Sequence, residues 1–226
     1  METIAYPIDT NFNSSVTNIL NNGHTIQFNY DPGSTTTLNG ITYNLLQFHF
    51  HTKSEHTINN KHYPMEMHLV HQDPNTGDLA VLGVFFKKGE WNPVLGNFIG
   101  MLPENENDEY NSSFTYNVYD FFSPYVYDKN RIIGEDERQF NALKFDNDEE
   151  GSLHENYNNN DVLDRYYTYS GSLTTPPCSE VVTWYVLKKP LKASRYQLRK
   201  FKEIMHANYR PIQDLNGRPV RFNKNN

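Results

Sequence analysis

Short runs in which apolar and polar residues alternate recur along this chain. Because successive side chains of a β-strand point to opposite faces, such alternation is typical of strands with one buried face. Five runs of β-strand character, rich in aliphatic, β-branched and aromatic residues, lie at 24–30, 45–51, 65–71, 79–86 and 181–187. Turn-forming sequences such as Asn-Asn-Gly and Asn-Thr-Gly-Asp separate them. The pattern predicts a sheet of mainly antiparallel strands.

Helical periodicity is rarer in this sequence. Residues 92–102 form a short candidate helix, and residues 195–207 form a stronger one. No internal repeat divides the chain. We therefore predict one domain over residues 1–226, of mixed α/β type dominated by β, with a central, mostly antiparallel, twisted β-sheet and short peripheral helices.

One acidic segment departs from this pattern. Residues 128–165 contain 11 acidic and 5 basic residues, so they carry −6 of the chain's net charge of −7. We interpret the segment as a surface insertion in the domain. A calcium loop is the alternative, because Asp146, Asp148, Glu150 and Gly151 fit the first half of an EF-hand. The twelfth position, which needs a bidentate glutamate, is Tyr157, and this weakens the alternative.

Composition narrows the classes of function. Hydrophobic residues make up 37% of the chain, with 16 Tyr and 14 Phe, which is enough for a large core. The acidic balance argues against a nucleic-acid partner or an anionic membrane surface. No apolar run approaches the roughly 20 residues of a membrane span, and no signal peptide is visible at the N-terminus. Cys178 is the only cysteine, so an intrachain disulfide is impossible, although pairing between chains is not.

Histidines gather on one face of a predicted strand. In the run 45–51, Gln47, His49 and His51 share one face, and Phe48 and Phe50 share the other. The phenylalanines fit a hydrophobic core. Two neighbouring histidines that point the same way fit either a surface pair or a metal site.

A second strand favours the metal site. In the run 65–71, Glu66 and His68 share a face, and an antiparallel neighbour would bring His68 beside His49 and His51. Three neutral imidazoles suit zinc and leave a fourth position open for water. We exclude His71, which falls on the opposite face from His68, and two histidines in the connection between the strands, His56 and His62.

Six motifs in chain order extend this site. They are NNGHT, QFHFH, SEHT, EMHLVH, GSLTTPPCSE and NYRPIQDLNGRPV, and they run from about Asn21 to Arg218. Together they resemble the α-class carbonic anhydrases of bacterial type, the standard example of a catalytic three-histidine zinc site. The resemblance implies the α-carbonic anhydrase fold and a carbonate dehydratase, which is a zinc lyase. In that reaction a zinc-bound hydroxide reversibly hydrates CO₂ to bicarbonate and a proton.

The resemblance implies contacts that support the zinc ligands. Gln47 and Glu66 correspond to the hydrogen-bond partners of His49 and His68. The backbone carbonyl of Asn208 corresponds to the group that holds the remaining histidine. Such contacts fix the tautomer and orientation of a ligating imidazole.

The resemblance also implies catalytic positions. Thr174 would accept a hydrogen bond from the hydroxide and donate its own proton to Glu55, so that it can only accept. His24, which follows Gly23 in a turn, corresponds to the proton shuttle. The apolar wall that holds CO₂ corresponds to Val70, Val81, Leu173, Val182 and Trp184, with Thr175 at its mouth.

The chain departs from the family pattern in two places. Only 23 residues precede His24, where the family has a longer region, and the segment that includes residues 128–165 is longer than usual. A shortened N-terminal region would uncover part of the sheet, so we expect self-association, for example a homodimer. By resemblance we also expect inhibition by sulfonamides and anions and a periplasmic or secreted location, although the sequence alone leaves the compartment unknown.

Two other functions remain as alternatives. The first is a binding or adhesion module on the same fold, with weak or no turnover. The second is a structural zinc site, which would need a fourth protein ligand. All three ligand histidines are present, and no cysteine lies near them in sequence. This pattern favours the enzyme.

Overall fold

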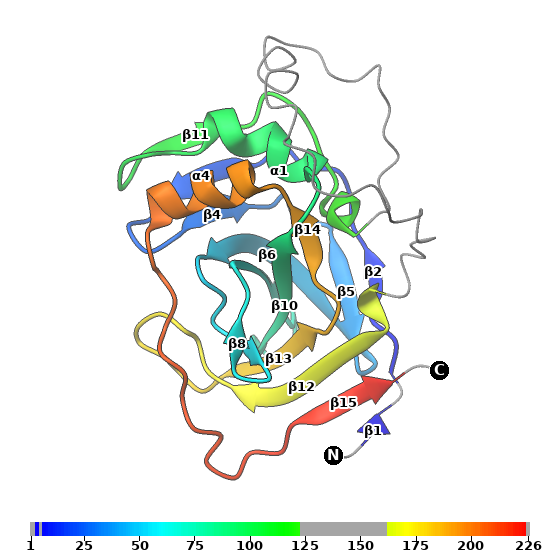
Figure 1. Ribbon diagram of the computed structural model, residues 1–226. Coiled ribbons are helices and arrows are strands. Elements are labelled where there is room, and N and C mark those ends of the chain that lie inside the picture. Colours follow the sequence, from blue (N-terminus) through cyan, green and yellow to red (C-terminus); the bar gives the residue numbers. More distant parts are fainter. Residues whose placement is uncertain (1–2, 5, 123–161, 225–226) are drawn as a thin grey trace.

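One large sheet forms the body of the protein (Figure 1). The computed structural model describes residues 3–4, 6–122 and 162–224. Thirteen strands pair within the sheet: β1 (Thr3–Ile4), β2 (Asp9–Asn11), β3 (Asn18–Asn21), β4 (Ile26–Asn29), β5 (Thr35–Leu38), β6 (Ile41–His51), β9 (Met65–Gln72), β10 (Leu79–Lys88), β11 (Glu109–Asn111), β12 (Arg165–Gly171), β13 (Val182–Leu187), β14 (Leu191–Ala193) and β15 (Arg221–Lys224). A separate ribbon pairs β7 (Thr57–Ile58) with β8 (Lys61–His62).

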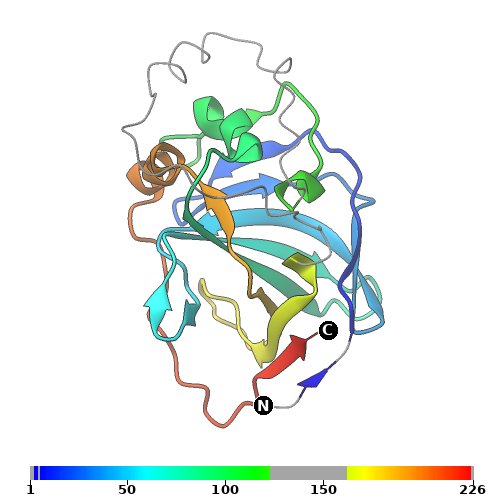
Figure 2. The same cartoon turned by 45° about the vertical axis from the view of Figure 1, so that its right-hand side comes forward.

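Antiparallel pairing dominates the sheet, as the sequence predicts. The main path runs β1-β15-β12-β13-β10-β9-β6-β4-β3-β11, with β14 beside β10 and β5 between β2 and β6. Only the pairs β1–β15, β10–β13 and β10–β14 are parallel among the described strands. Figures 1 and 2 show that the sheet is strongly twisted, with β1 and β15 at one edge and β11 near the opposite end. The predicted fold class is confirmed.

Short helices cover one end of the sheet (Figures 1 and 2). They are α1 (Pro93–Phe98), the 3₁₀ turns η1 (Ile99–Met101) and η2 (Val118–Phe121), and α4 (Arg195–Met205). Ser194 and Gln197 form a capping box at the start of α4, and Asn92 caps α1. The side chain of Gln197 also bonds both backbone groups of Asn92, so the two helix starts are tied together. None of the helices in the described ranges has the length and apolar character needed to cross a membrane.

The main hydrophobic core lies on one face of the sheet. Phe28, Phe48 and Phe50 are fully buried there, and the rings of Phe28 and Phe48 stack with centroids 4.7 Å apart. Burial of each such side chain contributes about 1.5–3 kcal/mol. The predicted placement of Phe48 and Phe50 in the core is confirmed, and their burial turns the intervening residues of β6 toward the other face.

A β-bulge sets which residues of β6 face the core. Tyr43 and Leu45 are buried, whereas Phe48 and Phe50 are buried beyond the bulge, so the buried positions change from odd to even numbers. The pairing with β9 shifts between Leu45 and Gln47, which leaves one extra residue in β6. A bulge of this kind re-aims the side chains that follow it. Here it directs the histidines of β6 away from the core.

The predicted acidic insertion ends earlier than expected. Val162 is fully buried and Leu163 is 5% exposed, both within the main core, and Arg165 begins β12. Residues 162–165 are therefore not part of a surface insertion, because Val162 and Leu163 pack in the core and Arg165 belongs to the sheet. The rest of the predicted insertion, including the calcium alternative at 146–157, lies outside the described residues.

His71 lies on the core face of β9, opposite in direction to His68, as predicted. It is fully buried, its Nε2 lies 2.9 Å from Thr36 Oγ1, and its Nδ1 lies 3.0 Å from the carbonyl oxygen of Leu69. Burial lowers the pKa of His71 from its ordinary value of 6.5 to about 4. The folded protein therefore requires a neutral imidazole at this position.

This burial predicts a pH dependence of stability. Above pH 6.5 His71 is neutral in both states, but between pH 6.5 and 4 the unfolded chain binds a proton that the folded chain does not. The free energy of unfolding should therefore fall by about 2 kcal/mol between pH 7 and pH 5 through this residue. In urea unfolding experiments, the free energy of unfolding of His71→Gln should fall less between pH 7 and pH 5 than that of the wild type. The exposed His206 supplies a control. The free energy of unfolding of His206→Gln should fall between pH 7 and pH 5 by as much as that of the wild type. An equal decrease in the free energy of unfolding of His71→Gln and the wild type would contradict the assignment of this pH dependence to His71.

Candidate metal centre

Two neighbouring strands bring three histidines together. His49 and His51 lie on β6, and His68 lies directly opposite His49 on β9. One ring nitrogen of each histidine lies within 4.8 Å of one ring nitrogen of the other two. His51 and His68 are buried, and His49 is partly buried. The predicted juxtaposition of these histidines is present in the structure.

The second ring nitrogen of each histidine has its own partner. His49 Nδ1 lies 2.9 Å from Gln47 Oε1, and His51 Nδ1 lies 3.1 Å from the carbonyl oxygen of Asn208. His68 Nε2 lies 3.1 Å from Glu66 Oε1. Each partner is an acceptor, so the imidazole nitrogen that faces it carries the proton. The other nitrogen of each ring then presents a lone pair to the centre of the cluster.

These lone pairs fit a bound metal ion. His51 Nε2 is buried and has no hydrogen-bond partner among the described residues, which is costly unless another group occupies the site. Burial, together with the neighbouring histidine, lowers the pKa of His51 to about 4, and burial and both neighbours lower the pKa of His49 well below 6.5. Neutral imidazoles at a shared centre are the donor set that zinc prefers.

Glu66 is the most connected polar group of the site. Its carboxylate is fully buried and accepts hydrogen bonds from the backbone N–H groups of Glu55 and His56, each at 2.9 Å. Its Oε1 also accepts from His68, and from His56 Nδ1 at 2.6 Å. Burial alone would raise the pKa of Glu66, but the adjacent His56 and His68 hold that pKa well below its usual range. A charged Glu66 thus orients His68.

His56 belongs to the site, although we excluded it as a ligand from the sequence. Burial lowers its pKa, but the charge and hydrogen bond of Glu66 outweigh burial, so the pKa of His56 is raised. His56 Nε2 lies 2.7 Å from the hydroxyl of Tyr169. His56, Glu66 and His68 are also close enough to bind an ion together. Both nitrogens of His56 already have partners, however, so this second group is a hydrogen-bond chain and fits a metal less well.

Glu55 has one oxygen bound and one free. Its Oε1 accepts a hydrogen bond from the backbone N–H of Arg210 at 2.8 Å. Its Oε2 is buried without a hydrogen-bond partner among the described residues and lies 3.9 Å from His68 Nδ1. The hydrogen bond from Thr174 to Glu55 that the resemblance implies is therefore not made in this structure. Thr174 is half-buried in the loop that follows β12.

An apolar cluster adjoins the histidines. Val70, Val81, Val182 and Trp184 are buried together, and Leu173 packs against them. The ring of Trp184 contacts that of His68, with centroids 4.7 Å apart. The five predicted wall residues are thus brought together beside the metal-binding group. Thr175 stands apart from the cluster; it is half-buried, and its carbonyl accepts the N–H of Cys178, which is a free thiol.

His24 is exposed in the turn between β3 and β4. The side chain of Asn22 accepts the backbone N–H groups of His24 and Thr25, which shapes the turn. The side-chain amide of Asn208 donates to the carbonyl oxygens of His24 (2.9 Å) and Phe50 (3.1 Å). Since the backbone carbonyl of Asn208 also faces His51 Nδ1, this residue links the turn of His24 to the three histidines.

Sequence reasoning missed three residues that shape the site. His56 and Tyr169 extend the hydrogen-bond chain from Glu66, and the motif SEHT that contains His56 could have drawn attention to it. Gly83 on β10 lies opposite His68, and a Cβ atom there would come within 2.8 Å of Glu66 Oε1. A glycine inside a strand can mark such a close approach, but nothing in the sequence names the group that approaches.

Comparison with known proteins identifies the family. The model of the family described as eukaryotic-type carbonic anhydrase matches residues 5–130 and 134–224. This chain belongs to that family. The predicted membership is confirmed.

Bacterial relatives of this carbonic anhydrase family agree with the match. The carbonic anhydrase of Nostoc sp. is 38% identical over 213 residues, which are 93% of this chain and 66% of the relative. The carbonic anhydrase of Klebsiella pneumoniae is 38% identical over 218 residues, which are 95% of this chain and 72% of the relative. The chain thus spans less than two thirds of the Nostoc relative's length.

Solved structures in the family have the same fold. The α-carbonic anhydrase from Thermovibrio ammonificans, in complex with the inhibitor sulfanilamide, is 36% identical with a TM-score of 0.76, over 98% of this chain and 81% of that one. Carbonic anhydrase Cah3 from Chlamydomonas reinhardtii, in complex with acetazolamide, is 29% identical with a TM-score of 0.76, over 98% of this chain and 84% of that one.

The close approach at Gly83 predicts a sensitive position. In Gly83→Ala the added methyl group must displace the buried Glu66 carboxylate, which four hydrogen bonds hold in place. We expect a loss of about 1–3 kcal/mol in the free energy of unfolding and weaker retention of zinc, because His68 loses its fixed orientation. Urea unfolding and zinc analysis after dialysis against a chelator measure the two effects. Gly100 has open space where its Cβ would lie, so Gly100→Ala should match the wild type. Unchanged zinc retention in Gly83→Ala would contradict the role given to Glu66.

Proposed function

We propose that this chain is a zinc-dependent carbonic anhydrase that reversibly hydrates CO₂ to bicarbonate and a proton. The observation that carries the proposal is the group formed by His49, His51 and His68, in which one nitrogen of each ring has an acceptor and the other faces the shared centre. Membership of the family supports it.

His49, His51 and His68 would hold Zn²⁺, through Nε2 of the first two and Nδ1 of the third. When bound, zinc supplies a Lewis acid that makes a water molecule nucleophilic at neutral pH. Gln47, Glu66 and the carbonyl of Asn208 keep the three rings in the required tautomers, so little reorganisation is needed when the ion binds. With three protein ligands, a fourth position stays open for water.

The apolar cluster provides a place for CO₂. Trp184 lies against His68, and Val70, Val81 and Val182 pack around it, so an uncharged apolar molecule would sit beside the metal-binding group. Water is excluded from such a wall, which favours CO₂ over its charged product. Bicarbonate would then leave by exchange with water.

Glu55 and Thr174 would orient the nucleophile. The free Oε2 of Glu55 is a buried acceptor near His68 Nδ1, and it needs a donor. We propose that the Thr174 hydroxyl supplies this donor in the loaded enzyme. Its oxygen would then only accept, which sets the direction in which the attacking oxygen points.

The alternatives have less support. A binding or adhesion module would not need hydrogen-bond acceptors that fix the tautomer of each histidine. Each of the three proposed ligands nevertheless has such an acceptor. A structural zinc site would need a fourth protein ligand. The groups of potential ligands among the described residues contain no cysteine, and the acidic member of the second group is already bonded to two histidines. The sulfonamide complexes of two relatives support inhibition of this chain by the same class of compound.

Loss of a ligand tests the proposed function. His68→Ala should lose most of its zinc and at least roughly 10²-fold in kcat/KM for CO₂ hydration, because two histidines hold the ion poorly. Metal analysis and stopped-flow hydration measure both. The wild type should contain one zinc per chain and be inhibited by sulfanilamide. His206→Ala, at an exposed position, should keep zinc and activity. Full activity in zinc-free protein would refute the proposal.

The exposure of His24 predicts a role in proton release. An exposed imidazole can accept a proton from the site and pass it to buffer near neutral pH. His24→Ala should lower kcat in dilute buffer by roughly tenfold or more, and should leave kcat/KM nearly unchanged because that ratio excludes later proton release. Added imidazole should restore much of kcat. An equal loss in kcat/KM would remove His24 from proton transfer, whereas His206→Ala should leave kcat unchanged.

A further inference from the structure

An exposed carboxylate lies against the turn that carries His24. Residues 22–25 form this turn between β3 and β4, and Gly23 has a positive φ of 79°. A Cβ atom built on Gly23 would come within 2.7 Å of both Oε1 and Cδ of Glu106, and the three atoms nearest to it all belong to Glu106. Glu106 therefore occupies the space beside Gly23, and His24 is the next residue along the chain.

Backbone hydrogen bonds hold the loop of Glu106 in this place. The N–H of Asn107 donates to the carbonyl oxygen of Asn21 at 2.7 Å, and the N–H of Asn21 donates to the carbonyl oxygen of Asp108 at 3.0 Å. The side-chain amide of Asn21, which is buried, also donates to the carbonyl oxygen of Pro103 at 3.2 Å. Since Asn21 directly precedes the turn, these bonds fix the backbone of Glu106 beside it.

The side chains of Glu106 and His24 can both form a new contact. Both are exposed, and within the part of the chain that the structure describes neither side chain has a hydrogen-bond or ion-pair partner. Residues 103–109 contain no lysine or arginine, and neither does the turn, so His24 is the one side chain of the two segments that can become a cation.

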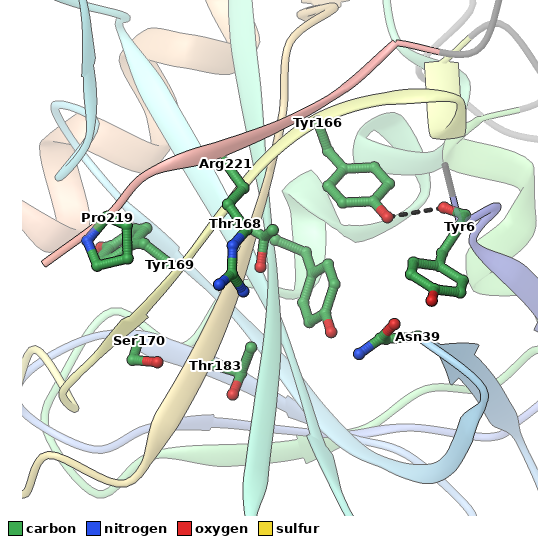
Figure 3. Close-up of a pocket in the computed structure, with 10 residues that line it drawn as sticks. Tyr6, Asn39, Tyr166, Thr168, Tyr169, Ser170, Thr183, Pro219 and Arg221 are labelled. Atoms are coloured by element: carbon green, nitrogen blue, oxygen red, sulfur yellow. Dashed lines mark hydrogen bonds between the residues drawn. The ribbon is translucent and has the colours of Figure 1, made fainter. Parts of the chain in front are cut away.

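The other charged site outside the histidine group differs in this respect. A cavity of about 490 Å³ lies over β12, β13 and β15 (Figure 3). Among the described residues that line it, Arg221 alone carries a charge, and Arg221 already has an interaction partner. The contact of Glu106 with the turn of His24 is therefore the better place to look for a further charge interaction.

The attraction between the two groups depends on the proton that His24 carries. A carboxylate attracts an imidazolium, which has a full positive charge, far more than it attracts a neutral imidazole. Between exposed groups such a pair changes an equilibrium only about two- to fivefold. An exposed side chain moves between staggered rotamers of similar energy, so an effect of this size is enough to select one of them while the ring is protonated.

We propose that Glu106 is a positioning residue for the protonated form of His24. When His24 has taken up a proton from the site, its imidazolium pairs with the Glu106 carboxylate on the solvent side of the turn, where a buffer base removes the proton. The neutral ring that remains is no longer attracted and can accept the next proton. Glu106 stays ionised throughout and takes up no proton itself. The inference rests on the proposed role of His24 in proton release.

Stopped-flow CO₂ hydration by the zinc-loaded full chain in dilute buffer tests the effect on turnover. Glu106→Gln should lower kcat about two- to fivefold and leave kcat/KM unchanged, because that ratio excludes proton release. Glu106→Asp keeps the charge and should retain more of kcat than Glu106→Gln. Glu104→Gln removes the same charge from the same loop, but Glu104 supplies none of the atoms nearest to Gly23, so this variant should match the wild type.

A double-mutant cycle shows whether Glu106 acts through His24. In the His24→Ala background, Glu106→Gln should have no further effect on kcat, because the cation that it attracts is absent. An equal loss of kcat in that background would overturn the proposal. So would an unchanged kcat in Glu106→Gln with His24 present, or a loss of kcat/KM as large as the loss of kcat.

The rotamers of His24 give a readout that does not depend on turnover. Three-bond NMR couplings, measured on the zinc-loaded full chain in mildly acidic buffer, report the χ1 populations of His24. The wild type and Glu104→Gln should share one preferred rotamer, and Glu106→Gln should reduce that preference about two- to fivefold. Equal populations in all three proteins would refute the pairing. A wild type without hydration activity would refute the proposed function instead, and the couplings would then decide on the pair by themselves.

Discussion

The antiparallel register of β6 with β9 is the constraint on which the candidate site depends. It places His49 opposite His68 and His51 opposite Glu66, so that backbone hydrogen bonds fix the positions of the three histidines and of Glu66, which is the partner of His68. A slip of one residue would turn the histidines toward the core and the phenylalanines toward the opposite face of the sheet. Burial of Phe48 and Phe50 opposes such a slip. The same hydrophobic energy that stabilises the fold therefore also positions the metal-binding group.

Electrostatic organisation of the site depends on one buried carboxylate. Glu66 accepts four hydrogen bonds, two from backbone N–H groups and two from histidine rings. A charge buried this deeply would be very costly without such partners. Once paired, it fixes the tautomer of His68 and holds His56 against Tyr169. Gly83 leaves the space that this arrangement needs, which makes a strand glycine part of the site without touching a ligand.

The two faces of the sheet have different chemistry near β12 and β13. On one face, Tyr169 and Trp184 adjoin the histidines and the apolar cluster. On the other face, Thr168 and Tyr185 present hydroxyl groups to a cavity that contains Arg221.

The sequence by itself determined the strand character of five runs, the shared face of His49 and His51, and the direction of His68, because side-chain alternation is a local property of a strand. It also determined the helices at 92–102 and 195–207, whose periodicity and caps are local. Only the tertiary structure decided that Val162 and Leu163 belong to the core, that His56 supports Glu66, and that Gly83 must lack a side chain. It also decided that Glu55 bonds Arg210 while Thr174 stays apart, and that a polar cavity opens behind Trp184. These features arise where segments distant in the chain meet, and their packing is not encoded in any local pattern.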